Sequence, residues 1–200
     1  MRDLVSDRLA RGMSPSTGAL HSGWPLAQRS PPEDANLRSA AVLVPLIDHA
    51  DGITVLLTQR AADMPKHAGQ ISFPGGTVVN GEAHPEVTAL RETEEEIGIP
   101  ASAIELIGRL SMRDTSTGFR VVPIVGFLRP PLRIVEDPSE VASVFEVPLD
   151  FVRDIRNHGT ERRIVRGEER EFRAMPYGDH YIWGLTARIL FELSQVLRDE

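Results

Sequence analysis

The sequence contains no cysteine among its 200 residues. Disulfides, thiolate metal sites and thiol nucleophiles are therefore excluded. No stretch approaches the roughly 18 consecutive apolar residues that span a bilayer. Residues 1–10 carry charges at Arg2, Asp3, Asp7 and Arg8 without an apolar run, unlike a signal peptide. We therefore expect a soluble cytoplasmic protein with no membrane partner.

Negative charge exceeds positive charge, with a formal net charge of −7, and no block of Lys and Arg is long enough to grip a nucleic-acid backbone. A chain without a basic patch is a poor ligand for a nucleic-acid backbone, so we expect no nucleic-acid partner. An acidic protein can still bind a phosphorylated small molecule when metal ions lie between the negative groups. This leaves small phosphorylated compounds as the favoured ligands.

The remaining composition is that of a globular domain, with 41% apolar and 26% charged residues. Residues 1–38 are broken by Ser14-Pro15-Ser16 and Ser30-Pro31-Pro32. We interpret this segment as an arm that either lies on the domain or is partly disordered. Residues 39–200 are predicted to form the domain.

Strands and helices are predicted to be mixed along the chain without regular βαβ alternation. This favours an α/β fold with a mixed β-sheet between helices. Pro45 and Pro123 lie inside predicted strands and suggest an edge or a bulge in each. Asp51-Gly52 predicts a hairpin turn. The predicted strands are 40–47, 53–58, 104–110, 121–128, 141–147, 162–166 and 172–175, and the predicted helices are 85–97, 148–155 and 183–197.

Three glutamates are predicted to share one face of the helix over residues 85–97. Val87, Leu90, Thr93 and Ile97 fall on one side of this helix, and the glutamates fall nearly opposite, at positions 92, 95 and 96. Like charges three or four residues apart repel each other by a few tenths of a kcal/mol. Magnesium prefers carboxylate oxygens and offsets such repulsion. A solvated acidic face is the alternative interpretation.

The segment 76–99 resembles the Nudix box, Gly-x5-Glu-x7-Arg-Glu-U-x-Glu-Glu-x-Gly-U, in which U is a bulky apolar residue. Thr93 replaces one apolar residue, and eight residues instead of seven separate Glu82 from Arg91. Either the loop holds one extra residue or Glu82 is not the equivalent glutamate. The matching positions are Gly76, Arg91, Glu92, Glu95, Glu96, Gly98 and Ile99.

The resemblance implies an α/β/α sandwich and a metal-dependent diphosphate hydrolase that uses Mg²⁺ or Mn²⁺. It assigns metal binding to Glu92, Glu95, Glu96 and the carbonyl of Gly75. Arg91 corresponds to the arginine that orients a glutamate. The family has no single motif position for the general base, so Glu95 and Glu140 are both candidates.

An upstream segment is similar to the signature of the coenzyme A pyrophosphatase branch, Leu-Leu-Thr-x-Arg-(Ser/Ala)-x3-Arg-x3-Gly-x3-Phe-Pro-Gly-Gly. Residues 56–61 and 66–76 match it, except that Pro65 replaces its second arginine beside Lys66. Residues 182–188 also resemble this branch. Arginine forms bidentate contacts with phosphate, and glycine allows close backbone approach. The implied substrate-binding residues are Arg60, Lys66, His67, Gly69, Gln70 and Gly76.

We therefore expect hydrolysis of coenzyme A to 4′-phosphopantetheine and adenosine 3′,5′-bisphosphate. A Nudix enzyme acting on ADP-ribose or NADH is the first alternative. A non-catalytic Nudix domain that binds a nucleotide is the second. The sequence leaves open whether the chain is a monomer or a homodimer.

Overall fold

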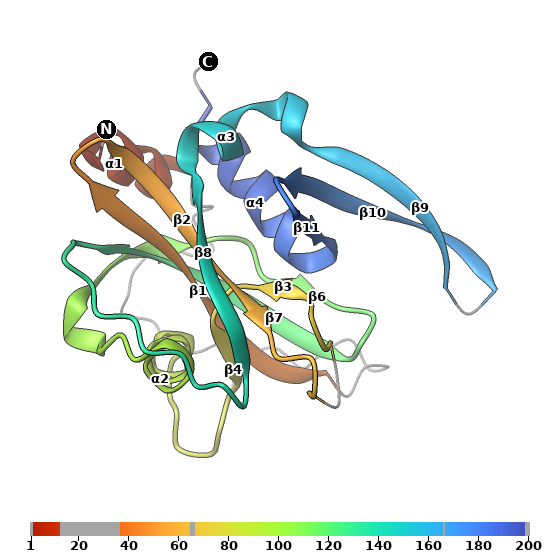
Figure 1. Ribbon diagram of the computed structural model, residues 1–200, viewed down its shortest axis with the longest axis horizontal. Coiled ribbons are helices and arrows are strands. Elements are labelled where there is room, and N and C mark those ends of the chain that lie inside the picture. The colour runs from red at the N-terminus through yellow and green to blue at the C-terminus, as the bar shows by residue number, and fades with distance from the viewer. Residues whose placement is uncertain (1, 13–36, 65–66, 166, 199–200) are drawn as a thin grey trace.

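The structure is a computed structural model that describes residues 2–12, 37–64, 67–165 and 167–198 (Figure 1). Helices cover both faces of a mixed sheet, and this arrangement confirms the predicted α/β class. The helices are α1 (Arg2–Gly12), α2 (Pro85–Ile97), η3 (Ala101–Ala103), α3 (Leu149–Arg153), η4 (Ile155–Asn157) and α4 (Gly184–Val196). The strands of the main sheet are β1 (Arg38–His49), β2 (Gly52–Arg60), β3 (Ile71–Ser72), β4 (Gly75–Thr77), β5 (Ile104–Arg109), β6 (Arg113–Asp114), β7 (Phe119–Leu128) and β8 (Val141–Pro148).

The main sheet is built around β1 and β7, which pair in parallel over their whole length. β1 and β2 form the antiparallel hairpin that Asp51-Gly52 predicted, with His49 opposite Gly52. β5 and β6 both pair with β7, and β3 and β8 both pair with β2. The connection between the parallel strands β1 and β7 contains α2, which packs on β1 and β4.

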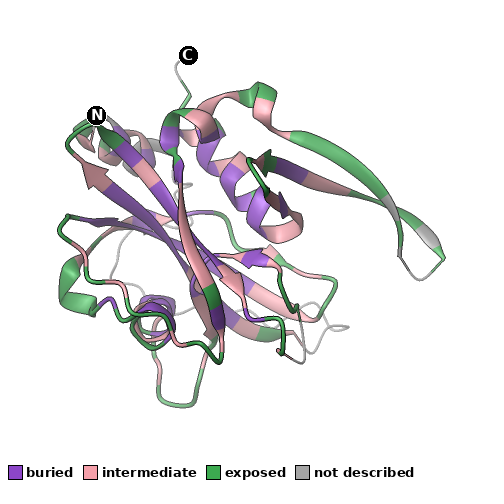
Figure 2. Ribbon diagram, in the orientation of Figure 1, coloured by how far each residue is buried: buried purple, intermediate pink, exposed green. Residues whose placement is uncertain are grey.

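Both faces of the sheet are buried, which explains the nearly continuous apolar run in β1. Its even-numbered residues Val44 and Leu46 join the larger core with α1, α3 and α4. Its odd-numbered residues Ala41 and Leu43 join a smaller core under α2. Figure 2 shows the resulting band of buried residues along the central strands and α4.

The two strand prolines do not mark edges or bulges, so this prediction was wrong. β1 contacts β4 through residues 40–42 and β2 through residues 46–49, and Pro45 lies between the two contacts. β7 likewise contacts β6 up to Val121 and β5 from Ile124 onward, with Pro123 between. Each missing N–H therefore faces a point where the neighbouring strand changes.

Helix α2 has the bounds that the sequence predicted. Pro85 occupies its first turn, where its missing N–H costs nothing. Gly98 ends it in the left-handed conformation, with φ 70°, and donates its N–H to the Glu94 carbonyl at 3.0 Å. Arg109 of β5 forms two hydrogen bonds with Glu86, which fixes the first turn of the helix to the sheet.

Part of the predicted N-terminal arm forms α1 and lies on the domain. Its residues Val5 and Leu9 are buried in the larger core, and Arg8 donates a hydrogen bond to the Leu197 carbonyl at 2.7 Å. Residues 13–36, which include both proline-rich breaks, lie outside the described residues. Among the described residues, no helix is long and apolar enough to cross a membrane.

A second, three-stranded sheet consists of β9 (Gly159–Val165), β10 (Glu168–Tyr177) and β11 (His180–Trp183). β9 and β10 form a hairpin that extends away from the body of the molecule (Figure 1). Both strands are longer than predicted, and β11 was not predicted. β11 contacts β3 and leads directly into α4. These contacts hold the second sheet beside the β3 end of the main sheet.

We predict that Leu9→Ala lowers the free energy of unfolding by about 2–5 kcal/mol, because it leaves a cavity in the larger core. The matched control is Ile164→Ala, since Ile164 is 79% exposed on the hairpin. Its loss should remain below about 1 kcal/mol. Urea unfolding of both variants measures the difference. Equal losses in the two variants would show that α1 does not pack on the core.

Candidate active site

Close approach of α2 to β4 builds the site. A Cβ atom on Gly75 would lie 2.4 Å from the Ala41 carbonyl oxygen, so no other residue fits beside β1. A Cβ atom on Gly76 would lie 2.4 Å from the carboxyl carbon of Glu92. Real Cβ atoms do not approach this closely, so Gly75 is required for β4 to lie against β1, and Gly76 is required for the carboxylate of Glu92 to rest on β4 in this position.

The helix face in contact with the sheet agrees only in part with the predicted one. Thr93 and Ile97 are fully buried as predicted, but Val87 is 46% exposed and Ala89 is fully buried in its stead. Glu96 is only 3% exposed, so the prediction that it faces away from the buried side was wrong. Small side chains allow the helix to lie close to the sheet, and Thr93 satisfies its hydroxyl by donating to the Ala89 carbonyl at 2.7 Å.

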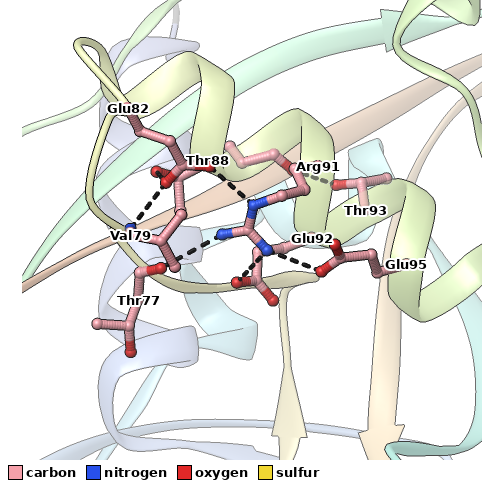
Figure 3. A network of polar contacts seen from close by, with 9 residues as sticks. Thr77, Val79, Glu82, Thr88, Arg91, Glu92, Thr93 and Glu95 are labelled. Atoms are coloured by element: carbon pink, nitrogen blue, oxygen red, sulfur yellow. Dashed lines mark hydrogen bonds and ion pairs between the residues drawn. The ribbon is translucent and has the colours of Figure 1, made fainter.

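Arg91 connects the loop before α2 with the glutamates on the helix (Figure 3). Its Nε donates to Glu82 at 2.7 Å. Its Nη1 lies 2.8 Å from Glu92 Oε1 and 2.7 Å from Glu95 Oε2. Its Nη2 donates to the Thr77 carbonyl at 3.3 Å. One guanidinium thus contacts three carboxylates, and the geometry suits a residue that orients Glu92 and Glu95.

Glu82 is oriented toward the helix despite the extra residue that separates it from Arg91. It accepts hydrogen bonds from Thr88 Oγ1 at 2.6 Å and from the Val79 N–H at 2.9 Å, in addition to that from Arg91. Burial raises the pKa of Glu82, but these hydrogen bonds outweigh it and the net pKa is lowered. These contacts favour the interpretation that Glu82 is the equivalent glutamate of the Nudix box and that the loop between Glu82 and Arg91 holds one additional residue.

Glu92 and Glu96 form the buried part of an acidic cluster. Burial raises the pKa of Glu96 to about 8, opposed by the charge of Arg60 and by a backbone hydrogen bond from Gly75. Burial also raises the pKa of Glu92, against the hydrogen bond and charge of Arg91. Glu140 adds negative potential at both glutamates. Glu95 differs from them, since its side chain is 60% exposed.

The loop that carries Glu140 is held against the end of α2. The Asp137 N–H donates to the Glu96 carbonyl at 2.9 Å, and the Val135 N–H donates to the Ile97 carbonyl at 3.0 Å. The Glu140 carbonyl accepts the Ala61 N–H at 2.8 Å, just beyond the end of β2. These contacts bring the candidate base from a distant loop next to the helix glutamates.

The predicted substrate-binding residues lie at the end of β2 and in the loop after it. Arg60 acts electrostatically on Glu96, and its buried Nε has no hydrogen-bond partner among the described residues. His67 adopts a positive φ of 58° and contacts Gln70 at 3.0 Å. Gly69 donates its N–H to the Arg60 carbonyl at 3.2 Å. Pro65 and Lys66 lie outside the described residues.

The donor set fits a divalent cation in its chemistry. Glu92 and Glu96 are carboxylates, whose oxygens suit Mg²⁺ and Mn²⁺, and burial, helped by their mutual repulsion and by Glu140, raises the pKa of Glu96 and outweighs Arg91 at Glu92. In the part of the chain that the structure describes, no three carboxylate or imidazole groups converge on one point. Glu95 instead contacts Arg91. A three-glutamate site therefore requires Glu95 to turn away from Arg91.

Comparison with known proteins identifies the class of domain to which this site belongs. A model of the NUDIX domain matches residues 37–184. The chain is 41% identical over 162 residues to an uncharacterized Nudix hydrolase, NudL, of Citrobacter koseri, covering 81% of this chain and 84% of the relative. NudL of Escherichia coli K12 is 40% identical over the same shares. The chain belongs to the Nudix family, and it is a diphosphate hydrolase of that family.

Solved structures support the fold independently. A MutT/nudix family protein from Enterococcus faecalis superposes with a TM-score of 0.54 at 22% identity, over 84% of this chain and 64% of that chain. The NUDIX domain of Shewanella oneidensis NrtR, solved with ADP ribose, has a TM-score of 0.50 at 19% identity, over 86% and 94%. Both confirm the Nudix α/β arrangement with a mixed sheet.

The raised pKa of Glu96 makes a prediction about stability without metal. Protonated Glu96 stabilises the fold fully below about pH 4.5, and this contribution is lost as pH rises through about 8. Glu96→Gln should therefore unfold at a higher temperature than the wild type in EDTA, by a margin that grows from pH 5 to pH 9. Thermal unfolding measures it, with Glu94→Gln, an exposed change on the same helix, as control. A margin independent of pH would contradict this interpretation.

Proposed function

We propose that this protein hydrolyses the diphosphate bridge of coenzyme A or its derivatives, releasing 4′-phosphopantetheine and adenosine 3′,5′-bisphosphate. Arg60 is the observation that carries the proposal. It belongs to the coenzyme A signature, yet its charge acts on Glu96 of the Nudix box, and its buried Nε has no hydrogen-bond partner among the residues that the structure describes. A guanidinium N–H with this freedom, beside the proposed metal-binding residues, suits a phosphate oxygen of the substrate.

Glu92, Glu96 and the Gly75 carbonyl are the proposed metal ligands, with Glu95 as a third carboxylate once it leaves Arg91. Bound Mg²⁺ or Mn²⁺ neutralises phosphate charge and lowers the pKa of water. Arg91 orients Glu92 and, until the metal binds, also holds Glu95, through the contacts in Figure 3. Gly76 lies directly beneath Glu92, so the diphosphate meets backbone rather than a side chain there.

Glu140 is the proposed general base, because it lies close enough to Glu92 and Glu96 to raise their pKa values and comes from a separate loop. It removes a proton from the attacking water. The oxygen of that water bonds to one phosphorus, and the bridging oxygen leaves with the other phosphate. Arg60 stabilises the negative charge that develops on the phosphate oxygens. Glu95 is less suited to this role while it pairs with Arg91.

The first prediction for this function concerns substrate choice. With Mg²⁺ or Mn²⁺ present, coenzyme A should be cleaved at least about tenfold more efficiently than ADP-ribose or NADH, a difference of about 1.4 kcal/mol in transition-state binding. Mass spectrometry of the products should show phosphopantetheine. Preferential cleavage of ADP-ribose or NADH would retain the Nudix chemistry and reject coenzyme A. Binding of nucleotides without cleavage would indicate a non-catalytic domain.

The second prediction concerns the glutamates. Glu92→Gln and Glu96→Gln should each lower kcat by at least about 100-fold, because each removes a charged ligand of the proposed metal. Glu94→Gln is the matched control, since Glu94 lies on the same helix but is exposed and has no assigned contact with the site. Circular dichroism checks the fold of each variant. Near-wild-type turnover by either metal-site variant, or full activity after chelation, would reject the assignment.

A further inference from the structure

A cavity of about 390 Å³ lies between the signature loop and the second sheet. One wall is Gln59 together with residues 68–71, and the other is formed by residues 179–181 and Trp183 of the β10–β11 turn and β11. None of the residues of the second wall belongs to the Nudix box or to the residues assigned above. The cavity is therefore a separate feature of the site region.

The cavity and the glutamates occupy opposite faces of β2. Consecutive side chains on a strand point to opposite faces, so Gln59 lines the cavity while Arg60 points to Glu96. The loop after β2 joins the two regions, since Gly69 lines the cavity and donates its N–H to the Arg60 carbonyl. Arg60 and the cavity are therefore adjacent at the end of β2.

Both walls of the cavity are fixed by contacts outside it. Thr186, at the start of α4, donates its hydroxyl to the Ile71 carbonyl at 2.9 Å. The ring of His180 stacks on Phe145 of β8, with centroids 3.6 Å apart and planes at 4°. Trp183 packs edge-on against Phe172 of the neighbouring strand. The walls are thus preformed, which limits the entropy lost when a ligand binds.

The side chains of the cavity select against phosphate. Its lining contains Asp179 as the charged side chain and includes no Lys or Arg among the described residues. The amides of Gln59 and Gln70 offer both donors and acceptors, while Tyr181 and Trp183 offer aromatic surface. This chemistry suits an uncharged chain that carries amide groups and apolar segments, and it repels an anionic group.

We propose that this cavity receives the pantetheine arm of coenzyme A, while the 3′-phosphoadenosine end lies elsewhere. The inference rests on the proposed function and specifies how the substrate is held. The arm has two amides, a hydroxyl, a terminal thiol and no charge, and its chain of about twelve bonds extends roughly 14 Å when straight. An arm of this length can extend from a diphosphate beside Arg60 into the cavity that is lined by the neighbouring Gln59.

The experiment uses pantetheine, the free arm without phosphate, as an inhibitor of coenzyme A hydrolysis. In the wild type it should inhibit competitively. In the double variant Gln59→Ala/Gln70→Ala its inhibition constant and the KM for coenzyme A should both rise at least about fivefold, a loss of about 1 kcal/mol. Inhibition by adenosine 3′,5′-bisphosphate should stay within about twofold, because the charged end does not use the cavity. Gln195→Ala is the matched control, since Gln195 is an exposed glutamine near the end of α4.

A second variant guards against local loss of structure in the loop. Asp179→Lys changes an exposed turn residue, and it should improve the KM for a coenzyme A thioester with a free carboxylate relative to coenzyme A. If coenzyme A is hydrolysed but pantetheine does not compete, or if the variants weaken only adenosine 3′,5′-bisphosphate, the cavity assignment is overturned and the proposed function stands. If the wild type does not cleave coenzyme A, the proposed function itself fails.

Discussion

The close contact between helix α2 and strand β4 is the constraint on which the site depends. Gly75 lies against β1 and Gly76 lies beneath Glu92, and a Cβ atom on either would collide with its neighbour. Ala89 and Thr93 provide the matching small surface on the helix. If this contact were wider, Glu92 and Glu96 would be hydrated and would keep ordinary pKa values. The short distance therefore sets the burial and the electrostatics of the acidic cluster.

The contact between α2 and β4 buries the carboxylates of Glu92 and Glu96, and burying charged groups opposes folding. Such a cost is common at functional sites. A buried carboxylate needs a counter-charge, and among the described residues the charge of Arg60 and a backbone hydrogen bond from Gly75 offset the burial of Glu96. The surrounding scaffold makes the arrangement tolerable. Residues of α1, α3 and α4 fill the opposite face of the sheet, and the Arg109–Glu86 pair fixes the first turn of α2. Stability is thus supplied away from the site.

The sequence predicts some of these features well and others poorly, for identifiable reasons. The bounds of α2 follow from local signals at Pro85 and Gly98, so they were predicted correctly. Thr93 and Ile97 were correctly predicted to be buried, but close packing favours Ala89 over the larger Val87, which hydrophobicity alone does not indicate. The strand prolines reflect where neighbouring strands change, which is a long-range property. The residues of β11 that line the cavity match no sequence motif, so the sequence did not predict this wall.

The balance of charge around the glutamates leaves too little positive charge for a diphosphate to bind directly. Arg91 is occupied by Glu82, Glu92 and Glu95, and Arg60 also faces Glu96. Glu140 adds further negative potential, and the whole chain has a net charge of −7. Two arginines do not neutralise these carboxylates and an anionic substrate together, so direct binding of the diphosphate would be repelled. A divalent ion held by the glutamates would supply the positive charge that an anionic substrate needs there.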